Sequence, residues 1–161
     1  MGTVPIFRFH MAFERSFHVA WAQLDSNAHM ANTAYLDLVV DVRFMYFAEK
    51  GFPPEEFAKR RIGPVVRRDE VDYHRELRLL DPVRVNFLLA GISEDASRFR
   101  IVNEVFREDG KLAARVTSLG GWFDLAARRL VAPPPDLARV LHELDRTPDF
   151  AALESSLRPV P

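Results

Sequence analysis

One apolar segment, residues 32–50, constrains the fold of this chain more than any other part of the sequence. Its apolar residues form a stripe at helical spacing and also fill most of the remaining circumference: Leu36, Val39, Val40, Phe44 and Phe47, then Tyr35, Leu38, Val42, Met45 and Tyr46. A helix that is apolar nearly all round is usually buried. The sequence therefore predicts a long central helix that is capped by Asn32 or Thr33 and ends near Lys50, before Gly51.

The flanking segments have the period of two that is typical of half-buried strands. A strand-like segment, 13–23, precedes the long helix, and a short second helix is expected after Pro53. Alternating runs then follow between residues 65 and 125, separated by turn signals such as Asp109-Gly110. Short turns favour antiparallel pairing, because parallel strands need long crossovers. The predicted fold class is α+β, with an antiparallel sheet of about five strands wrapped around one long central helix.

Composition limits the domain organisation and the class of protein. The chain has 161 residues, 48% of them hydrophobic and 28% charged, which is typical of one globular domain. We expect this domain to span 1–161, with its core at about 13–135 and a C-terminal helical extension, capped by Asp136, at about 136–157. The sequence has no cysteine, which excludes disulfides, thiolate catalysis and Cys-based zinc sites.

Charge and hydropathy indicate the expected partners and location. A net charge of −1 argues against a nucleic-acid partner. No apolar run approaches the roughly 20 residues that span a membrane, so no membrane partner is expected. The N-terminus lacks the pattern of an export signal. These features favour a cytoplasmic protein.

Four polar residues gather immediately before the long helix. Asp25, Asn27, His29 and Asn32 fall within eight residues, between the first strand-like segment and the helix. Side chains and free backbone N–H groups at such a junction can be directed at a ligand. Asp and Asn are also ordinary turn and cap residues. Taken alone, the stretch fits a turn with a helix cap as well as it fits a binding site.

Three stretches together carry a resemblance to a known family. They are WAQLDSNAHMANTAYL at 21–36, VDYHRELRLLDPVRV at 71–85 and REDGKLAARVTSLGGWFD at 107–124. Their order and spacing resemble the hotdog-fold thioesterases of the 4-hydroxybenzoyl-CoA thioesterase-like superfamily. Two positions depart from the family pattern: Ala28 stands where Gly is usual, and Ala31 stands where the first of two Asn residues is usual.

The resemblance implies an acyl-CoA thioesterase that hydrolyses an acyl-CoA or acyl-carrier-protein thioester to free acid and thiol. Coenzyme A would enter only as part of the substrate, with no other cofactor and no metal. Asp25 matches the family's catalytic Asp, as nucleophile or general base. The backbone N–H groups of His29, Met30 and Ala31, at the helix N-terminus, could receive the oxyanion.

The remaining polar candidates each have two interpretations. Asn27 or Asn32 could orient the water or the thioester carbonyl. For His29, a structural, hydrogen-bonded role fits better than a catalytic one. Asp41 lies on an apolar part of the helix, where an isolated carboxylate would be costly. For Asp41, an ion pair with Arg43 or with an arginine across a dimer is favoured over a role as catalytic acid from a second subunit.

The resemblance indicates substrate contacts, and the predicted sheet indicates how the chain assembles. Ser97 and Arg98 begin a strand where some relatives hold coenzyme A, so they are the candidate CoA contacts, with Arg67-Arg68 and Arg128-Arg129 as alternatives. A single curved sheet leaves edges to be covered, which favours a homodimer or a dimer of dimers with sites at subunit interfaces. Several bulky side chains could shape the acyl pocket: Phe44, Met45, Phe57, Trp122 and Phe123.

Two other functions would use the same residues. Hotdog enoyl-CoA hydratases carry an Asp followed by an Asn two positions later and a His five positions later. Here His29 follows Asp25 by four positions and the preceding Pro is missing. A non-catalytic acyl-binding protein is the other alternative, and the departures at Ala28 and Ala31 leave it open.

Overall fold

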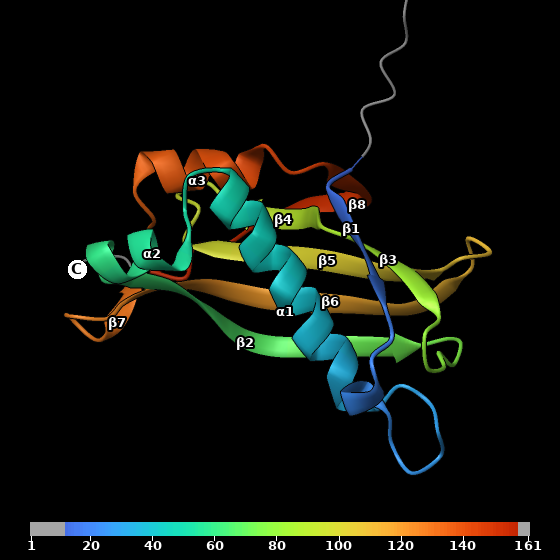
Figure 1. Cartoon of the computed structure of the whole chain (residues 1–161). Helices are drawn as coiled ribbons and strands as arrows, with labels where there is room; N and C mark the ends of the chain where they lie inside the picture. Colours follow the sequence, from blue (N-terminus) through green and yellow to red (C-terminus); the bar gives the residue numbers. More distant parts are fainter. Residues whose placement is uncertain (1–11, 158–161) are drawn as a thin grey trace, which may run out of the picture.

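The computed structural model describes residues 12–157, which form three α-helices and eight β-strands in one sheet (Figure 1). The ends of the predicted domain, 1–11 and 158–161, lie outside the described residues. The helices are α1 (Asn32–Glu49), α2 (Pro54–Arg60) and α3 (Pro135–His142). The strands are β1 (Glu14–His18), β2 (Ile62–Tyr73), β3 (Pro82–Asn86), β4 (Leu88–Ser93), β5 (Arg98–Arg107), β6 (Leu112–Asp124), β7 (Arg129–Val131) and β8 (Arg146–Leu153).

Strand β5 is at the centre of the sheet. It pairs with β6 along one side and with β3 and β4 along the other, and all of these pairings are antiparallel. Strand β2 pairs with β6, β1 with β3, and β8 with β4, while β7 pairs with the end of β6. Among the described strands β2 has no second partner, so its outer side is a free edge of the sheet.

Helix α1 confirms the predicted central helix and lies across one face of the sheet (Figure 1). Its side chains Val39 and Val42 are fully buried in a core that includes Val85 and Val105 of the sheet. Gly51, at φ +89°, ends the helix in the left-handed region that glycine adopts without strain. The short helix after Pro53 is also confirmed, as α2.

The prediction of about five strands is wrong. The alternation from Val83 to Leu89 suggested one strand, but the structure breaks it at Phe87 into β3 and β4. Strand β3 pairs with Val105–Arg107 of β5 and β4 pairs with Phe99–Val102, so the two short strands follow different halves of β5. A bulge within β4 also shifts the register between Leu89 and Gly91. A bulge adds one unpaired residue to a strand, and the alternation of apolar residues in the sequence did not indicate this irregularity. The segment 13–23 is likewise shorter than predicted, because a 3-10 turn at Trp21–Gln23 follows β1.

The predicted C-terminal helical extension at 136–157 is also wrong. Helix α3 begins at Pro135 and ends at His142, and β8 then runs parallel to β4. Gly91 of β4 permits this pairing, because a Cβ atom there would lie 2.7 Å from the backbone oxygen of Ala151. The apolar spacing from Leu137 to Leu144 gave the helix correctly, but no periodic signal follows it.

A cluster of hydroxyl groups joins the end of β8 to the turn between β4 and β5. The carboxylate of Asp95 accepts hydrogen bonds from Ser93 and Ser155, and the hydroxyl of Ser97 accepts one from the backbone N–H of Ser156 at 2.9 Å. Partial burial raises the pKa of Asp95, but the hydrogen bonds from Ser155, Ser93 and Ser97 outweigh it and hold this pKa well below its ordinary value. The cluster therefore holds the C-terminal segment against the sheet.

One side of α1 is not covered by the sheet. Val40, Phe44 and Met45 are 39%, 36% and 38% exposed, and Val66 on the neighbouring strand β2 is 45% exposed. Val40 and Phe44 line a common cavity with Val66, so these two residues lie beside the free edge of the sheet. The prediction that α1 is buried all round is therefore confirmed only for the side of the helix that faces the sheet.

Candidate functional site

An open, polar hollow of about 380 Å³ lies at the N-terminal end of α1. It brings together three of the four polar residues predicted before the helix, Asp25, His29 and Asn32. The other residues that line it are Met30, Tyr35, Tyr73, His74, Arg75 and Glu76. The segment after β2 is therefore part of the site. In the sequence, the stretch VDYHRELRLLDPVRV supported only the family resemblance, and none of its residues was predicted to belong to the site.

The loop before α1 is held by its own hydrogen bonds. One carboxylate oxygen of Asp25, Oδ1, accepts the backbone N–H of Asn27 at 2.8 Å, and the backbone N–H of Asp25 donates to the carbonyl of His29 at 2.9 Å. This turn leaves the second oxygen of Asp25 without a hydrogen-bond partner among residues 12–157. One oxygen of the carboxylate therefore closes a turn, and the other is available to a ligand. The predicted cap from Asn32 or Thr33 is wrong, because Ala31 occupies the N-cap position of α1 and the helix has no side-chain cap hydrogen bond.

Ala28 adopts the left-handed conformation that its family position usually assigns to glycine. Its φ is +60°, so the loop keeps the expected path despite the Cβ atom. For a residue other than glycine this conformation costs roughly 1–2 kcal/mol. The departure at Ala28 therefore leaves the loop geometry in place and introduces local strain.

Ala28→Gly is expected to stabilise the protein by up to about 1 kcal/mol, because relief of strain exceeds the extra entropy that glycine gives the unfolded chain. Denaturant unfolding followed by circular dichroism measures this change. Ala127→Gly, in the exposed turn after β6, serves as a control without a positive φ. Equal or lower stability of the Ala28→Gly protein would show that the loop is not strained.

His29 is placed as a structural histidine would be. Its Nε2 lies 3.1 Å from a carboxylate oxygen of Glu76, and its backbone forms a bridge with Arg78. A hydrogen bond from Arg78 lowers the pKa of Glu76, and His29 adds to this effect. Glu76 is therefore charged at neutral pH and orients the imidazole at the edge of the hollow.

The structure gives the predicted oxyanion donors unequal roles. The N–H groups of Met30 and Ala31 already donate to the carbonyls of Leu77 and Gln23, at 2.7 and 2.8 Å. Neither amide is therefore directed at a ligand. The N–H groups of His29, Asn32 and Thr33 have no acceptor among the described residues, whereas the N–H of Ala34 in the first turn of α1 donates to the carbonyl of Ala31 at 3.0 Å.

Two other polar candidates lie away from this hollow. Asn27 is exposed and uses its backbone to close the turn, so its side chain does not line the site. Asp41 is exposed in the middle of α1, and Arg43 is buried and bonded to other residues. The predicted Asp41–Arg43 ion pair is therefore wrong, because two residues that are two positions apart on a helix do not face each other.

The two candidate CoA contacts have different environments. Ser97 is fully buried, and its hydroxyl is engaged with Ser155 and Ser156 in the cluster that holds β8. Arg98 is partly exposed on the outer face of the sheet, where it lines a hollow of about 410 Å³ with Arg68 and Arg100. Of the pair, only Arg98 is accessible to a phosphate.

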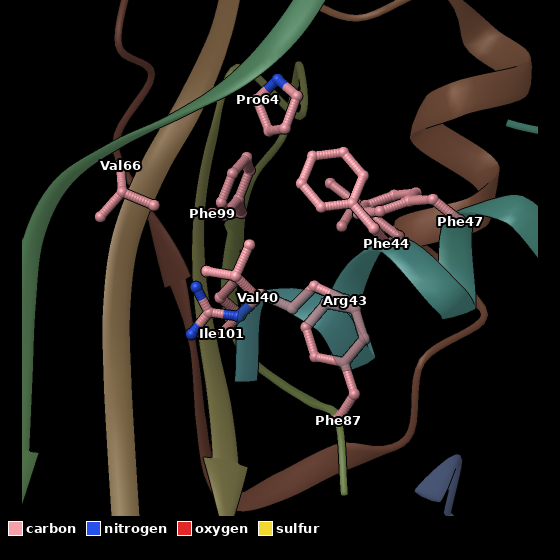
Figure 2. A pocket seen from close by; sticks show the side chains of 10 residues that line it. Val40, Arg43, Phe44, Phe47, Pro64, Val66, Phe87, Phe99 and Ile101 are labelled. Atoms are coloured by element: carbon pink, nitrogen blue, oxygen red, sulfur yellow. The ribbon is translucent and has the colours of Figure 1, made fainter. Parts of the chain in front are cut away.

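An apolar cavity of about 190 Å³ lies between α1 and the sheet (Figure 2). Its wall is formed by Val40, Arg43, Phe44, Phe47, Pro64, Val66, Phe87, Phe99, Ile101 and Leu141. Of the five bulky side chains considered for the acyl pocket, Phe44 lines this cavity. Trp122 and Phe57 do not line it, and their rings contact each other and the ring of Phe47 in the aromatic core.

Arg43 is the charged residue in the wall of this cavity. Its Nε donates to Asn103 and one terminal nitrogen donates to Ser118, both at 2.8 Å. Burial lowers the pKa of Arg43 to about 10, and the charge of Asp69 partly opposes this change. The guanidinium therefore remains protonated at neutral pH inside an apolar wall.

The described residues place limits on other kinds of site. No described helix is long and apolar enough to cross a membrane. Within residues 12–157, no group of three His, Asp or Glu side chains is placed to hold a metal ion.

Comparison with known families identifies the class of protein. The profile of the thioesterase-like superfamily matches residues 19–141. The chain therefore belongs to this superfamily, which confirms the resemblance drawn from the three sequence stretches. A search of curated proteins finds no match.

Solved structures show that the fold is that of the hotdog thioesterases. A hypothetical protein from Staphylococcus aureus, in complex with CoA, is similar with 21% identity and a TM-score of 0.77, covering 85% of this chain and 87% of its own. A 1,4-dihydroxy-2-naphthoyl-CoA thioesterase from Synechocystis is similar with 16% identity and a TM-score of 0.74, covering 85% of this chain and 100% of its own. The probable thioesterase YbaW from Escherichia coli has 18% identity and a TM-score of 0.70, covering 83% and 99%.

Proposed function

We propose that this protein is an acyl-CoA thioesterase in which Asp25 activates the attacking water or attacks the thioester itself. The observation that carries the proposal is the second oxygen of Asp25, which has no partner among the described residues and lies at an open hollow beside the start of α1. The family supports thioester hydrolysis in general, and the CoA-bound structure from Staphylococcus aureus supports coenzyme A as the thiol.

In the general-base form of the reaction, Asp25 takes a proton from water and the hydroxide adds to the thioester carbonyl carbon. The carbonyl oxygen becomes an oxyanion, which the N–H of His29 and the first-turn N–H groups of Asn32 and Thr33 can stabilise with help from the helix dipole. The C–S bond then breaks, and the proton held by Asp25 passes to the leaving thiolate. Asn32 lines the same hollow and can orient the water.

The apolar cavity that would take the acyl group does not share a wall residue with the Asp25 hollow. Asn32 and Phe44 are twelve positions apart on α1, which corresponds to about 18 Å along the helix axis. A second copy resolves this separation. Two-fold pairing of the exposed sides of α1 and the free edges of β2 sets the helices antiparallel, so that Asp25 of one copy faces the cavity of the other.

We infer that the functional unit is a homodimer, alone or within a dimer of dimers. The exposed apolar residues Val40 and Phe44 lie beside the free edge of β2, and such patches and edges are usually covered by a partner. Arg98, together with Arg68, is the proposed contact for the phosphates of coenzyme A on the outer face.

A thiol-release screen over aromatic, short, long and dicarboxylic acyl-CoAs tests this function. We expect release of free coenzyme A from at least one class, with acid as the other product. Loss of water from a 3-hydroxyacyl-CoA without free thiol would instead select the enoyl-CoA hydratase alternative. Binding of acyl-CoAs with no turnover of any would select the non-catalytic alternative.

A further inference from the structure

Tyr35 has a hydroxyl group that the proposed reaction does not use. The residue is only 3% exposed, and its side chain lines the Asp25 hollow. The two other tyrosines of the chain donate their hydroxyls to backbone carbonyls, at 2.7 Å for Tyr46 and 2.9 Å for Tyr73. The hydroxyl of Tyr35 has no hydrogen-bond partner among residues 12–157. Because a buried hydroxyl without a partner costs stability, folding alone does not account for this group.

The position of Tyr35 on α1 places its side chain beside the start of the helix. Tyr35 follows Asn32 by three positions, so the two residues share one face, and long side chains on a helix lean back toward its N-terminus. The ring of Tyr73 contacts the ring of Tyr35 edge-on, with 5.3 Å between the centroids. The hydroxyl of Tyr73 in turn reaches the carbonyl of Asn32. Tyr73 therefore holds the Tyr35 ring against the first turn of α1.

The Tyr35 hydroxyl is open to the hollow and is not enclosed in the core. Among the described residues, the side-chain atoms that are both fully enclosed and unpaired belong to Arg100, Trp122 and Thr147. The unpaired Tyr35 hydroxyl is not one of them, so it is accessible from the space that this residue lines, which is the Asp25 hollow. A ligand in the hollow can therefore contact this hydroxyl.

The hydroxyl of Tyr35 is a donor that keeps its proton. Burial raises the pKa of Tyr35 to about 12, and the nearby Tyr73 and Glu76 raise it further. The phenol is therefore neutral at the pH at which a thioester is hydrolysed by an enzyme. A neutral donor that is already in place can stabilise a negative charge that develops during a reaction.

From this arrangement we propose that Tyr35 is a further catalytic residue, whose hydroxyl donates a hydrogen bond to the oxyanion of the tetrahedral intermediate. The thioester oxygen gains its charge only when the carbonyl carbon is attacked, so this bond is stronger in the transition state than in the bound substrate. Two of the three amides predicted for this role, those of Met30 and Ala31, are already bonded elsewhere. The hydroxyl keeps its own proton, so Asp25 still transfers the proton of the water to the thiolate. This inference rests on the proposed function and adds a side-chain donor to it.

Tyr35→Phe tests this role, because it removes only the hydroxyl oxygen. We expect kcat for the best acyl-CoA of the screen to fall by roughly 10²-fold, while KM and the Kd of free coenzyme A stay within about twofold of the wild type. The melting temperature should be unchanged or higher, because the lost hydroxyl has no partner in the folded chain. The measurements are steady-state thiol release, calorimetric titration with coenzyme A, and thermal unfolding.

Tyr46→Phe is the matched control, since it removes the same atom from the same helix. The hydroxyl of Tyr46 donates to Val140 in the core and Tyr46 does not line the hollow, so this variant should lose thermal stability and keep the wild-type kcat. Wild-type kcat in Tyr35→Phe would overturn the inference. A melting temperature that falls as in Tyr46→Phe, or failure to fold, would also overturn it, because the hydroxyl would then be structural. No hydrolysis of any acyl-CoA by the wild type would instead overturn the proposed function.

Discussion

Replacing Asp25 by asparagine is expected to lower kcat/KM for thioester hydrolysis by roughly 10²- to 10⁴-fold. An amide has nearly the shape of the carboxylate, and its oxygen can still accept the N–H of Asn27 that holds the turn. It cannot take a proton from water or attack a thioester effectively. The measurement is thiol release from the best acyl-CoA of the screen, with the oligomeric state and circular dichroism spectrum compared with those of the wild type.

Two carboxylates on α1 provide the comparison for this variant. Asp37 is exposed and lines neither hollow, so Asp37→Asn should retain wild-type activity. Asp41→Asn tests the remaining alternative, in which Asp41 of the second subunit is the catalytic acid. Full activity of Asp25→Asn together with loss of activity in Asp41→Asn would move the catalytic carboxylate to Asp41 and contradict the role proposed for Asp25.

The polar stretch before α1 could be predicted from the sequence because its chemistry is local. Asp25, His29 and Asn32 lie close together in the chain and remain close in the fold. The opposite side of the hollow could not be predicted in the same way. Tyr73 and Glu76 reach it because β2 pairs with β6 and its C-terminal end passes the start of α1. The Tyr73 hydroxyl, for example, donates to the carbonyl of Asn32 at 2.9 Å.

The roles of the backbone amides depend on pairing that a sequence does not display. The N–H of Met30 is used by Leu77, which is far away in the chain and approaches through the loop before β3. The same limit applies to Arg43, whose partners Asn103 and Ser118 lie on β5 and β6. The apolar pattern of the helix predicted that this part of α1 is buried. Only the register of the sheet shows which polar groups accept hydrogen bonds from the guanidinium.

The long helix and the antiparallel sheet were predictable because both follow from hydrophobic periodicity and short turns. The Asp109-Gly110 turn is confirmed, with Gly110 at φ +77° and the Lys111 N–H bonded to the Asp109 carboxylate. Strand β8 was missed because it is held by long-range contacts. Its pairing depends on the absence of a side chain at Gly91 and on the hydroxyl cluster around Asp95, and neither leaves a periodic pattern.

The Asp25 hollow and the apolar cavity are far apart on one chain, and this separation leads to a second prediction with a large expected effect on activity. If Asp25 of one copy serves the cavity of the other, two different inactive variants should restore activity when they form a mixed dimer. Asp25→Asn removes the carboxylate and leaves its cavity intact. Val40→Trp, at an exposed position on the cavity wall, blocks the cavity and leaves its Asp25 intact. Because Val40 also lies on the proposed pairing surface, size-exclusion chromatography must first show that this variant is a dimer. The mixed dimer then contains one site in which both parts are wild type.

Co-expression of Asp25→Asn and Val40→Trp chains in equal amounts is expected to give about a quarter of wild-type activity, because half of the dimers are mixed and each has one complete site of two. Thiol release by protein purified through two different affinity tags, which isolates the mixed dimer, should rise to about half of the wild-type value per dimer. Two differently tagged Asp25→Asn chains, purified in the same way, give the background. Activity of the mixed dimer no higher than this background would place Asp25 and its acyl cavity within a single chain, since each chain of the mixed dimer would then carry one defective part.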